Sequence, residues 1–252
     1  MNKDTLRQIF VALAVAATIA MNFLANIIPF NGQNTGEISD RFKVFFVPAG
    51  YVFSIWGLIY IGLAAYAVYQ ALPAQKSEPS LRRIGWPFLV ASAANIIWLI
   101  FWHYNLFPLS EVAMLTLLVS LIIIYLRLGI GITEVGAGMR WAVHIPFSVY
   151  LGWISVATIA NTTDLLYYWN WGGWGISPQA WAVIMLAVAV LLGLIMALRR
   201  RDVAFLAVLL WAFAGIAVKQ ALFPLVANAA WIAALLVAGE IILAIWLSRR
   251  KL

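Results

Sequence analysis

Long apolar runs alternate with short polar or Pro- and Gly-containing segments along almost the whole chain. A helix needs about 20 apolar residues to cross the hydrocarbon core of a bilayer, and eight runs come close to that length. The pattern therefore predicts an all-α, polytopic transmembrane helix bundle of about eight spans. The expected spans are Arg7–Ile28, Pro48–Leu72, Trp86–His103, Glu111–Gly129, Arg140–Thr163, Pro178–Leu198, Val203–Lys219 and Leu225–Leu247.

Two of these spans have an alternative interpretation. The seventh is the shortest, and only the turn at Pro224 separates it from the eighth, so one long kinked helix is the competing prediction. The first follows Lys3 and Arg7, as a cleaved signal peptide would. Its apolar part is longer than a typical signal-peptide core, and no small-residue cleavage site precedes the polar loop. We expect a retained helix.

Composition supports a membrane protein. The 252 residues are 65% hydrophobic and 10% charged, with a mean hydropathy of +0.97, whereas soluble domains average about 45–50% apolar and 25% charged residues. These values exclude an ordinary soluble enzyme. The chain contains no cysteine, which excludes disulfides, thiolate metal sites, iron–sulfur clusters and cysteine nucleophiles.

The basic residues fall mainly on one side of the eight spans. That side carries 13 of the 16 Lys and Arg residues, and the other side holds only Arg41, Lys43 and Lys219. Cytoplasmic loops of membrane proteins are enriched in Lys and Arg. We therefore expect both termini in the cytoplasm, in a plasma membrane such as a bacterial inner membrane. The same rule explains the net charge of +7 without a nucleic-acid partner.

Two outer loops stand out. Residues Pro29–Val47 form a long polar loop with turn signals at Asn31-Gly32 and Asn34-Thr35-Gly36, and loops of this length are usually functional or disordered. The loop Asp164–Ser177 gathers aromatic residues among glycines. Aromatic rings at this level anchor in the headgroup zone, so an interfacial belt is favoured over a binding site. These rings are Tyr167, Tyr168, Trp169, Trp171 and Trp174.

Catalytic and metal sites are not predicted. The only histidines, His103 and His144, fall near opposite ends of their spans, so most of the roughly 30 Å core separates them and they cannot share a metal or haem iron. The chain has no nucleophile elbow, P-loop or dinucleotide fingerprint. Glu240 is an acid inside a span, which makes it a functional candidate. In the alternative interpretation it faces the bundle interior, protonated or paired with one of Arg199–Arg201.

Polar and aromatic residues recur at helical spacing in the first five spans. Residues three or four apart share one helix face, and amides in hydrocarbon must face neighbouring helices or a cavity. Convergence of these stripes predicts an aromatic pocket for a flat apolar ligand, with the long outer loop as its lid. Alternatively, the amides bridge helices and the indoles fill the core. The stripes are Asn22 and Asn26; Trp56 and Tyr60; Asn95, Trp98 and Trp102; Trp153, Ala157 and Asn161.

Three of these stretches resemble a known family. Residues 48–60 read PAGYVFSIWGLIY, residues 95–98 read NIIW with Phe101-Trp102 after them, and residues 150–153 read YLGW, followed by Ala157 and Asn161. Their order and spacing resemble the second, third and fifth helices of the TspO/MBR family, also called translocator proteins or tryptophan-rich sensory proteins. The resemblance covers residues 1–165, a five-helix unit, and leaves residues 166–252 as a three-helix extension.

The resemblance implies a function. Members of that family bind tetrapyrroles such as protoporphyrin and haem, and some bind sterols or benzodiazepine-type ligands, between the helices beneath the first loop. The implied role is a membrane receptor or sensor that takes a porphyrin or haem as ligand and requires no cofactor. The implied pocket residues are Trp56, Asn95, Trp98, Trp153, Ala157 and Asn161, with Tyr60 and Trp102 on the same faces.

Some features depart from the family pattern. Val149 replaces the proline that often precedes the fifth-helix tyrosine, so a helix distortion is expected nearer Pro146. The three added spans and Glu240 favour a small-molecule or lipid transporter as an alternative. A second alternative is a porphyrin-degrading activity, reported for some relatives, with tryptophans as electron relays. Gly85 and the stretch 91–94 would permit close helix packing, and hence a homodimer.

Overall fold

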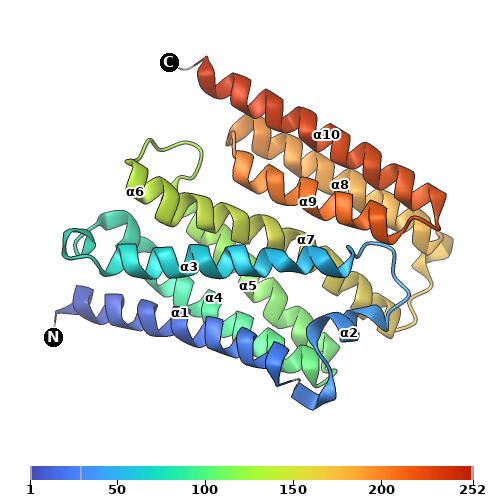
Figure 1. Cartoon of the computed structure of the whole chain (residues 1–252), viewed down its shortest axis with the longest axis horizontal. Helices are drawn as coiled ribbons and strands as arrows, with labels where there is room; N and C mark the ends of the chain where they lie inside the picture. The colour runs from blue at the N-terminus through green and yellow to red at the C-terminus, as the bar shows by residue number, and fades with distance from the viewer. Residues whose placement is uncertain (1, 29, 251–252) are drawn as a thin grey trace.

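The computed structural model describes residues 2–28 and 30–250, and within these ranges it is helical with no strand. The helices run side by side along one direction and form a bundle (Figure 1). This confirms the predicted all-α polytopic fold.

Seven helical segments are long and apolar enough to cross a membrane. The shorter α9 (Val203–Lys219, 17 residues) lies beside them. The seven are α1 (Lys3–Ile27), η2 with α3 (Gly50–Ser54, Ile55–Ala71), α4 (Pro79–His103), α5 (Phe107–Leu128), α6 to α7 (Ala137–Met139, Arg140–His144, Ile145–Tyr168), α8 (Pro178–Arg199) and α10 (Pro224–Arg249). Short connecting turns are η1 (Phe30–Gly32), α2 (Thr35–Asp40), η3 (Pro73–Gln75) and η5 (Gly173–Gly175).

The last two helices are separate. The chain turns after Lys219, and α10 packs back along α9 (Figure 1). Pro224 occupies the first turn of α10, where its missing N–H costs no helical hydrogen bond. The alternative of one long kinked helix is therefore wrong.

Both termini lie at the same end of the bundle (Figure 1). Basic side chains make contacts there across segments: Arg82 pairs with Asp4 at 2.5 Å, and Arg200 donates to the Ile130 carbonyl at 3.3 Å. The positive-inside rule assigns this end to the cytoplasm, which remains a prediction. We call the opposite end, which carries residues 30–48 and 169–177, the outer end.

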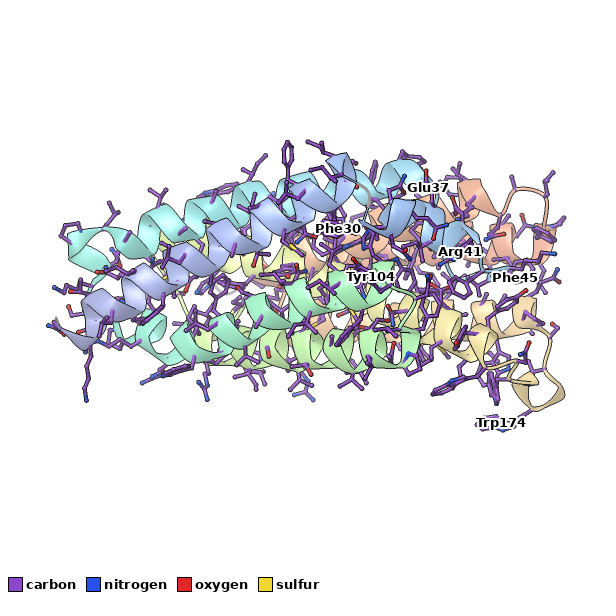
Figure 2. The ribbon with its side chains drawn as sticks, turned by 90° about the horizontal axis from the view of Figure 1, so that it is seen from below. Phe30, Glu37, Arg41, Phe45, Tyr104 and Trp174 are labelled. Carbon is purple, nitrogen blue, oxygen red and sulfur yellow. The ribbon has the colours of Figure 1, made fainter. Side chains whose placement is uncertain are left out.

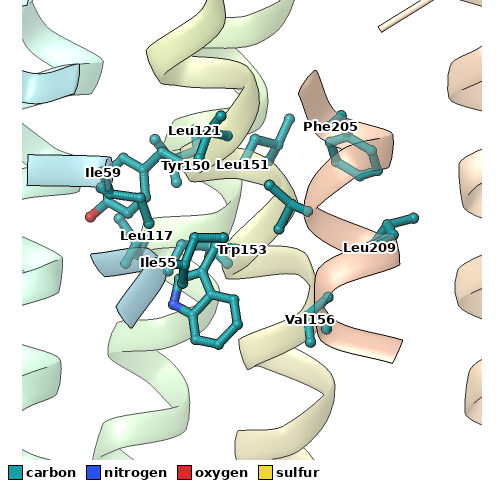
Figure 3. Packing of buried hydrophobic residues seen from close by; sticks show 14 of the residues in the cluster. Ile55, Ile59, Leu117, Leu121, Tyr150, Leu151, Trp153, Val156, Phe205 and Leu209 are labelled. Atoms are coloured by element: carbon teal, nitrogen blue, oxygen red, sulfur yellow. The ribbon is translucent and has the colours of Figure 1, made fainter. Parts of the chain in front are cut away.

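Helix α7 is central. Figure 3 shows Tyr150 and Trp153 on the side next to α3, while Leu151 and Val156 face Phe205 and Leu209 of α9. Gly152 allows the approach of α9, since a Cβ there would lie 3.1 Å from the Val208 Cβ and 3.2 Å from the Phe205 carbonyl oxygen. Small residues serve this purpose at membrane helix interfaces.

A buried carboxylate joins three helices. Asp202, at the N-terminus of α9, accepts hydrogen bonds from the Tyr125 hydroxyl at 2.8 Å, the Ser148 hydroxyl at 2.7 Å and the Phe205 amide at 3.1 Å. The last bond is a helix N-cap. One side chain thus ties α5, α7 and α9 together.

The expected helix distortion is present. Residues Arg140–His144 form a π-helical turn immediately before Pro146. Proline has no N–H to donate to the carbonyl four residues earlier, and π-turns in helices accommodate such irregularities. Pro146 also packs on Gly62 of α3, where an added Cβ would come within 2.9 Å of the Pro146 Cβ.

Candidate functional site

A small cavity lies beneath the long outer loop, and we call it the tryptophan cavity. Its volume is about 50 Å³, and four indoles line it: Trp56 of α3, Trp98 and Trp102 of α4, and Trp153 of α7. The other lining residues are Thr35, Ser39, Val47, Pro48, Phe53, Met114, Val156, Ala157, Ala160, Asn161 and Asp164.

The rings pack closely. Trp98 and Trp102, one helical turn apart, stack with centroids 6.0 Å apart and an angle of 22° between planes. Trp153 meets Trp56 edge to face at 6.3 Å and Phe53 at 5.6 Å. Offset-stacked and edge-to-face pairs are the preferred aromatic geometries, so the walls are well-packed pairs.

A buried hydrogen-bond network supports the cavity. Asn161 accepts the Trp98 indole N–H at 2.9 Å and donates to the Glu111 carboxylate at 2.5 Å. Thr162 donates to the other Glu111 oxygen at 2.7 Å. These bonds join α4, α5 and α7. They also fix the orientation of the Trp98 ring.

Two polar atoms next to the cavity have no partner among the described residues. They are the indole nitrogen of Trp153 and the Oδ1 atom of Asp164, and both are buried. Buried polar atoms are nearly always hydrogen-bonded in native structures. Trp153 offers a donor and Asp164 an acceptor to whatever occupies the cavity.

Residues 30–48 cover the cavity, and we call this segment the lid. Its helix α2 begins with a capping box between Asn34 and Glu37. Trp102 donates its indole N–H to the Thr35 carbonyl at 3.2 Å, and Asn31 donates to the His103 carbonyl at 3.1 Å. Figure 2 shows Phe30, Glu37, Arg41 and Phe45 in succession along the molecule toward the outer end.

Helix α9 and the turn after it hold the lid and the start of the second span. Lys219 pairs with Asp40 at 2.7 Å, and Gln220 donates to the Phe45 carbonyl at 3.2 Å. Two further bonds reach the segment before α3: the Ala49 amide donates to Gly215 at 3.1 Å, and the Trp211 indole donates to Val52 at 3.1 Å. Helix α9 and the turn after it therefore position the lid.

Six of the ten predicted site residues line the tryptophan cavity: Trp56, Trp98, Trp102, Trp153, Ala157 and Asn161. Asn22, Asn26, Tyr60 and Asn95 are not among its lining residues. Asn22 donates to Asn95 at 2.7 Å and so bridges α1 and α4, Asn26 donates to the Asn22 carbonyl, and Tyr60 stacks on Trp56. For Asn22 and Asn95 the helix-bridging alternative describes the geometry, whereas Asn26 bonds within its own helix. Met114 of α5 lines the tryptophan cavity, and no described residue of α1 does.

Sequence reasoning missed two acids. In the sequence pattern Glu111 is the first residue of a span and Asp164 the first residue of a loop, and neither position indicates a site. Asp164 lies three residues after Asn161, which places both on one face of α7, so helical spacing could have identified it. The pairing of Glu111 with Asn161 joins different helices, and no local pattern signals it.

The remaining candidates lie elsewhere. Glu240 is buried, and its Oε2 atom lies against Gly193 of α8. Its burial against α8 places it inside the bundle, and among the described residues it forms no ion pair with Arg199–Arg201. His103 is in the last turn of α4 and His144 is in the π-turn before α7, at opposite ends of the bundle.

Comparison with known families agrees with the fold. The sequence pattern of the family described as TSPO-like protein matches residues 8–243, which include α8, α9 and most of α10. Searches of curated proteins and of solved structures found no match. The match spans nearly the whole chain, and the chain is an integral, multi-pass membrane protein that belongs to the TSPO-like protein family.

Proposed function

We propose that the protein is a membrane receptor that binds a flat apolar ligand of the tetrapyrrole type in the tryptophan cavity. One observation carries the proposal: four indoles from three helices surround a single space beneath a lid. Sites for such ligands are mostly aromatic, with a few polar groups that set orientation. Trp153 and Asp164 supply those groups.

The unpartnered atoms fit this ligand class. A tetrapyrrole carries pyrrole N–H donors and unprotonated nitrogen acceptors in one plane. The Asp164 oxygen accepts from a donor, and the Trp153 indole donates to an acceptor. Both groups come from α7 and border the same space.

The size of the cavity requires the lid to move. At about 50 Å³ it has room for a few water molecules, whereas ligand pockets span about 300–1,000 Å³. The structure is then the closed form of the receptor. Opening breaks the contacts of Thr35 and Asn31 with α4, and these are single hydrogen bonds between neutral groups worth about 0.5–1.5 kcal/mol each.

Titration of the purified full chain with protoporphyrin, read by tryptophan quenching, tests the proposal. Trp98→Ala and Trp153→Ala should each weaken binding about tenfold, because each removes an aromatic wall worth about 1–2 kcal/mol. Trp86→Ala is the matched control, since Trp86 is 79% exposed on the bundle surface. Equal affinity in the wild type and both cavity variants would contradict the proposed site.

A buried carboxylate favours one second candidate, a transporter of small molecules or lipids. Glu240 lies between α8 and α10 with one oxygen unpartnered among the described residues. Uptake into reconstituted vesicles should then fall in Glu240→Gln. Unchanged uptake would remove this carboxylate from the mechanism.

A porphyrin-degrading activity is tested by loss of porphyrin absorbance under illumination, in wild type against Trp153→Phe.

A homodimer would use another surface than the one suggested by the small residues. Gly85 packs against the Arg7 side chain of α1, and Ala91 and Ala94 are buried within the chain. The close packing that these residues permit is therefore used between helices of one protomer.

A further inference from the structure

A second and larger cavity lies on the other side of the lid. Its volume is about 580 Å³, and it is bounded by lid residues 43–46, the last turns of α7, the loop 171–176 and the start of α8. Figure 2 shows Phe45 and Trp174 at this outer end of the molecule. The volume falls within the range of sites for small organic ligands. We call this space the lid–α8 cavity.

Its walls are apolar and held in place. Trp171 and Trp181 line it with ring centroids 5.3 Å apart, and the Trp181 indole donates to the Gly173 carbonyl at 2.9 Å. Phe46 and Met185 complete the apolar surface. The hydrogen bond from Trp181 fixes the loop, so the cavity wall is preformed.

The hydroxyl groups along α7 are already used. Thr158 donates to the Ile154 carbonyl at 2.7 Å, and Thr163 donates to the Ile159 carbonyl at 2.8 Å. The single proton of the Thr162 hydroxyl has two acceptors within reach, a Glu111 oxygen at 2.7 Å and the Thr158 carbonyl at 2.8 Å. The three hydroxyl protons therefore have acceptors within the protein and are not free donors for a ligand. The body of a ligand here must be apolar.

One charge stands at the edge of this apolar space. Lys43 is the single charged residue among the described residues that line the cavity. Its side chain is exposed, and it forms no hydrogen bond or ion pair within the described part of the chain. The ammonium group is therefore free to meet an anion. The outer end is also where aromatic rings mark the headgroup level.

We propose that the lid–α8 cavity binds an amphiphile with an apolar body and one anionic group, a carboxylate or a phosphate, placed beside Lys43. The volume admits one chain or fused-ring body, the aromatic walls contact it, and the single cation sets its direction. The site shares no lining residue with the tryptophan cavity, so the proposal is independent of tetrapyrrole binding.

Photolabelling of the full chain tests this site. The protein is reconstituted in phosphatidylcholine nanodiscs and labelled with a photoreactive palmitate analogue, and labelled peptides are mapped by mass spectrometry. Labels should concentrate in residues 158–171 and 178–185. Oleate should compete, and methyl oleate, which has the same chain without the charge, should compete poorly.

Variants separate the contributions. Lys43→Gln should weaken oleate competition about two- to fivefold, the scale of an exposed ion pair. Arg41→Gln is the matched control, because Arg41 lies in the same loop, contacts Asn105 and does not line the cavity. Ala182→Phe and Ile159→Trp should each fill the cavity and abolish competed labelling. Two filling variants are made, and one that folds is enough for the test. Folding is judged by the elution profile and the melting temperature of each variant.

Three results would overturn the proposal. Labels spread evenly over the outward faces of α5 and α10 would mean partition into the bilayer only. Equal competition by oleate and methyl oleate would remove the anion site. Unchanged labelling in a folded, filled variant would exclude the cavity. Trp98 does not line the lid–α8 cavity, so Trp98→Ala should leave labelling unchanged, and failure of either proposal is distinguishable from failure of the other.

Discussion

Trp98 of α4 donates its indole N–H to the Oδ1 atom of Asn161 on α7, and the two atoms lie 2.9 Å apart. The same amide donates to Glu111 of α5. Asn161 thus fixes the Trp98 indole, which forms one wall of the tryptophan cavity. Asn161 is itself hydrogen-bonded to the buried Glu111. The geometry of the cavity depends on three helices at once.

Replacement of Asn161 should destabilise the bundle. Asn161→Leu keeps a similar volume and leaves both the Trp98 indole and a Glu111 oxygen without their partner. We expect a loss of about 1–3 kcal/mol, because unsatisfied buried groups are costly while hydrogen bonds within membranes are individually modest. Melting in detergent, followed by tryptophan fluorescence, measures the change.

Ser155→Ala provides the control for this variant. Among the described residues the Ser155 hydroxyl bonds only to the Leu151 carbonyl of its own helix, so its loss should stay within about 0.5 kcal/mol. Equal melting temperatures for Asn161→Leu and the wild type would show that the network is not coupled to folding.

The lid should exchange faster when its contact with α4 is removed. Trp102→Phe retains an aromatic side chain, smaller than the indole, and deletes the hydrogen bond from Nε1 to the Thr35 carbonyl. Amide hydrogen exchange in residues 35–46 should rise about three- to tenfold, the effect of one net hydrogen bond on a local opening equilibrium. Trp86→Phe, on the exposed face of α4, should leave exchange in the lid unchanged.

Asp202 should be a main determinant of stability at the end that carries the termini. Asp202→Ala removes the acceptor of Tyr125, Ser148 and the Phe205 amide together. We expect a loss of about 2–4 kcal/mol from buried donors left unpaired. Tyr125→Phe and Ser148→Ala should each cost less, and their double variant should be non-additive because they share one carboxylate.

A glycine pair in the α5–α6 connection provides an internally controlled test of backbone conformation. Gly131 has φ +78°, and a Cβ there would overlap the Arg200 carbonyl. Gly131→Ala should therefore cost about 2–4 kcal/mol from the strained backbone and the clash.

Gly136, five residues later, has φ −62° and open space around it. Gly136→Ala should change the free energy of unfolding by less than about 1 kcal/mol. Equal melting temperatures for the two alanine variants would contradict the close approach of the loop to the α8–α9 turn.

Much of the fold is predictable because each membrane helix is a long apolar run bounded by polar, Pro or Gly residues. Pro224 and the polar residues before it mark the break between α9 and α10, and the distribution of basic residues favours an even number of spans. The stripes of α3, α4 and α7 predict which indoles converge, since spacing fixes the face of each helix. Trp56, Trp98 and Trp153 follow that rule.

The spacing of residues along a helix does not predict how that helix is rotated relative to its neighbours. Asn22 and Asn26 share a face, as the pattern predicts, but that face meets Asn95 rather than the cavity. The volume of the space depends on rotamers of four large rings. The contacts of Lys219 and Gln220 with the lid join segments more than 170 residues apart, and the sequence contains no local signal for them.

Lys43–Phe46 line the lid–α8 cavity, and the next two residues, Val47 and Pro48, line the tryptophan cavity. A ligand in one cavity that shifts this segment changes the free energy of ligand binding in the other cavity. By thermodynamic linkage, each ligand then changes the affinity of the protein for the other ligand by the same factor. Two molecules that never touch would thereby regulate each other through six residues.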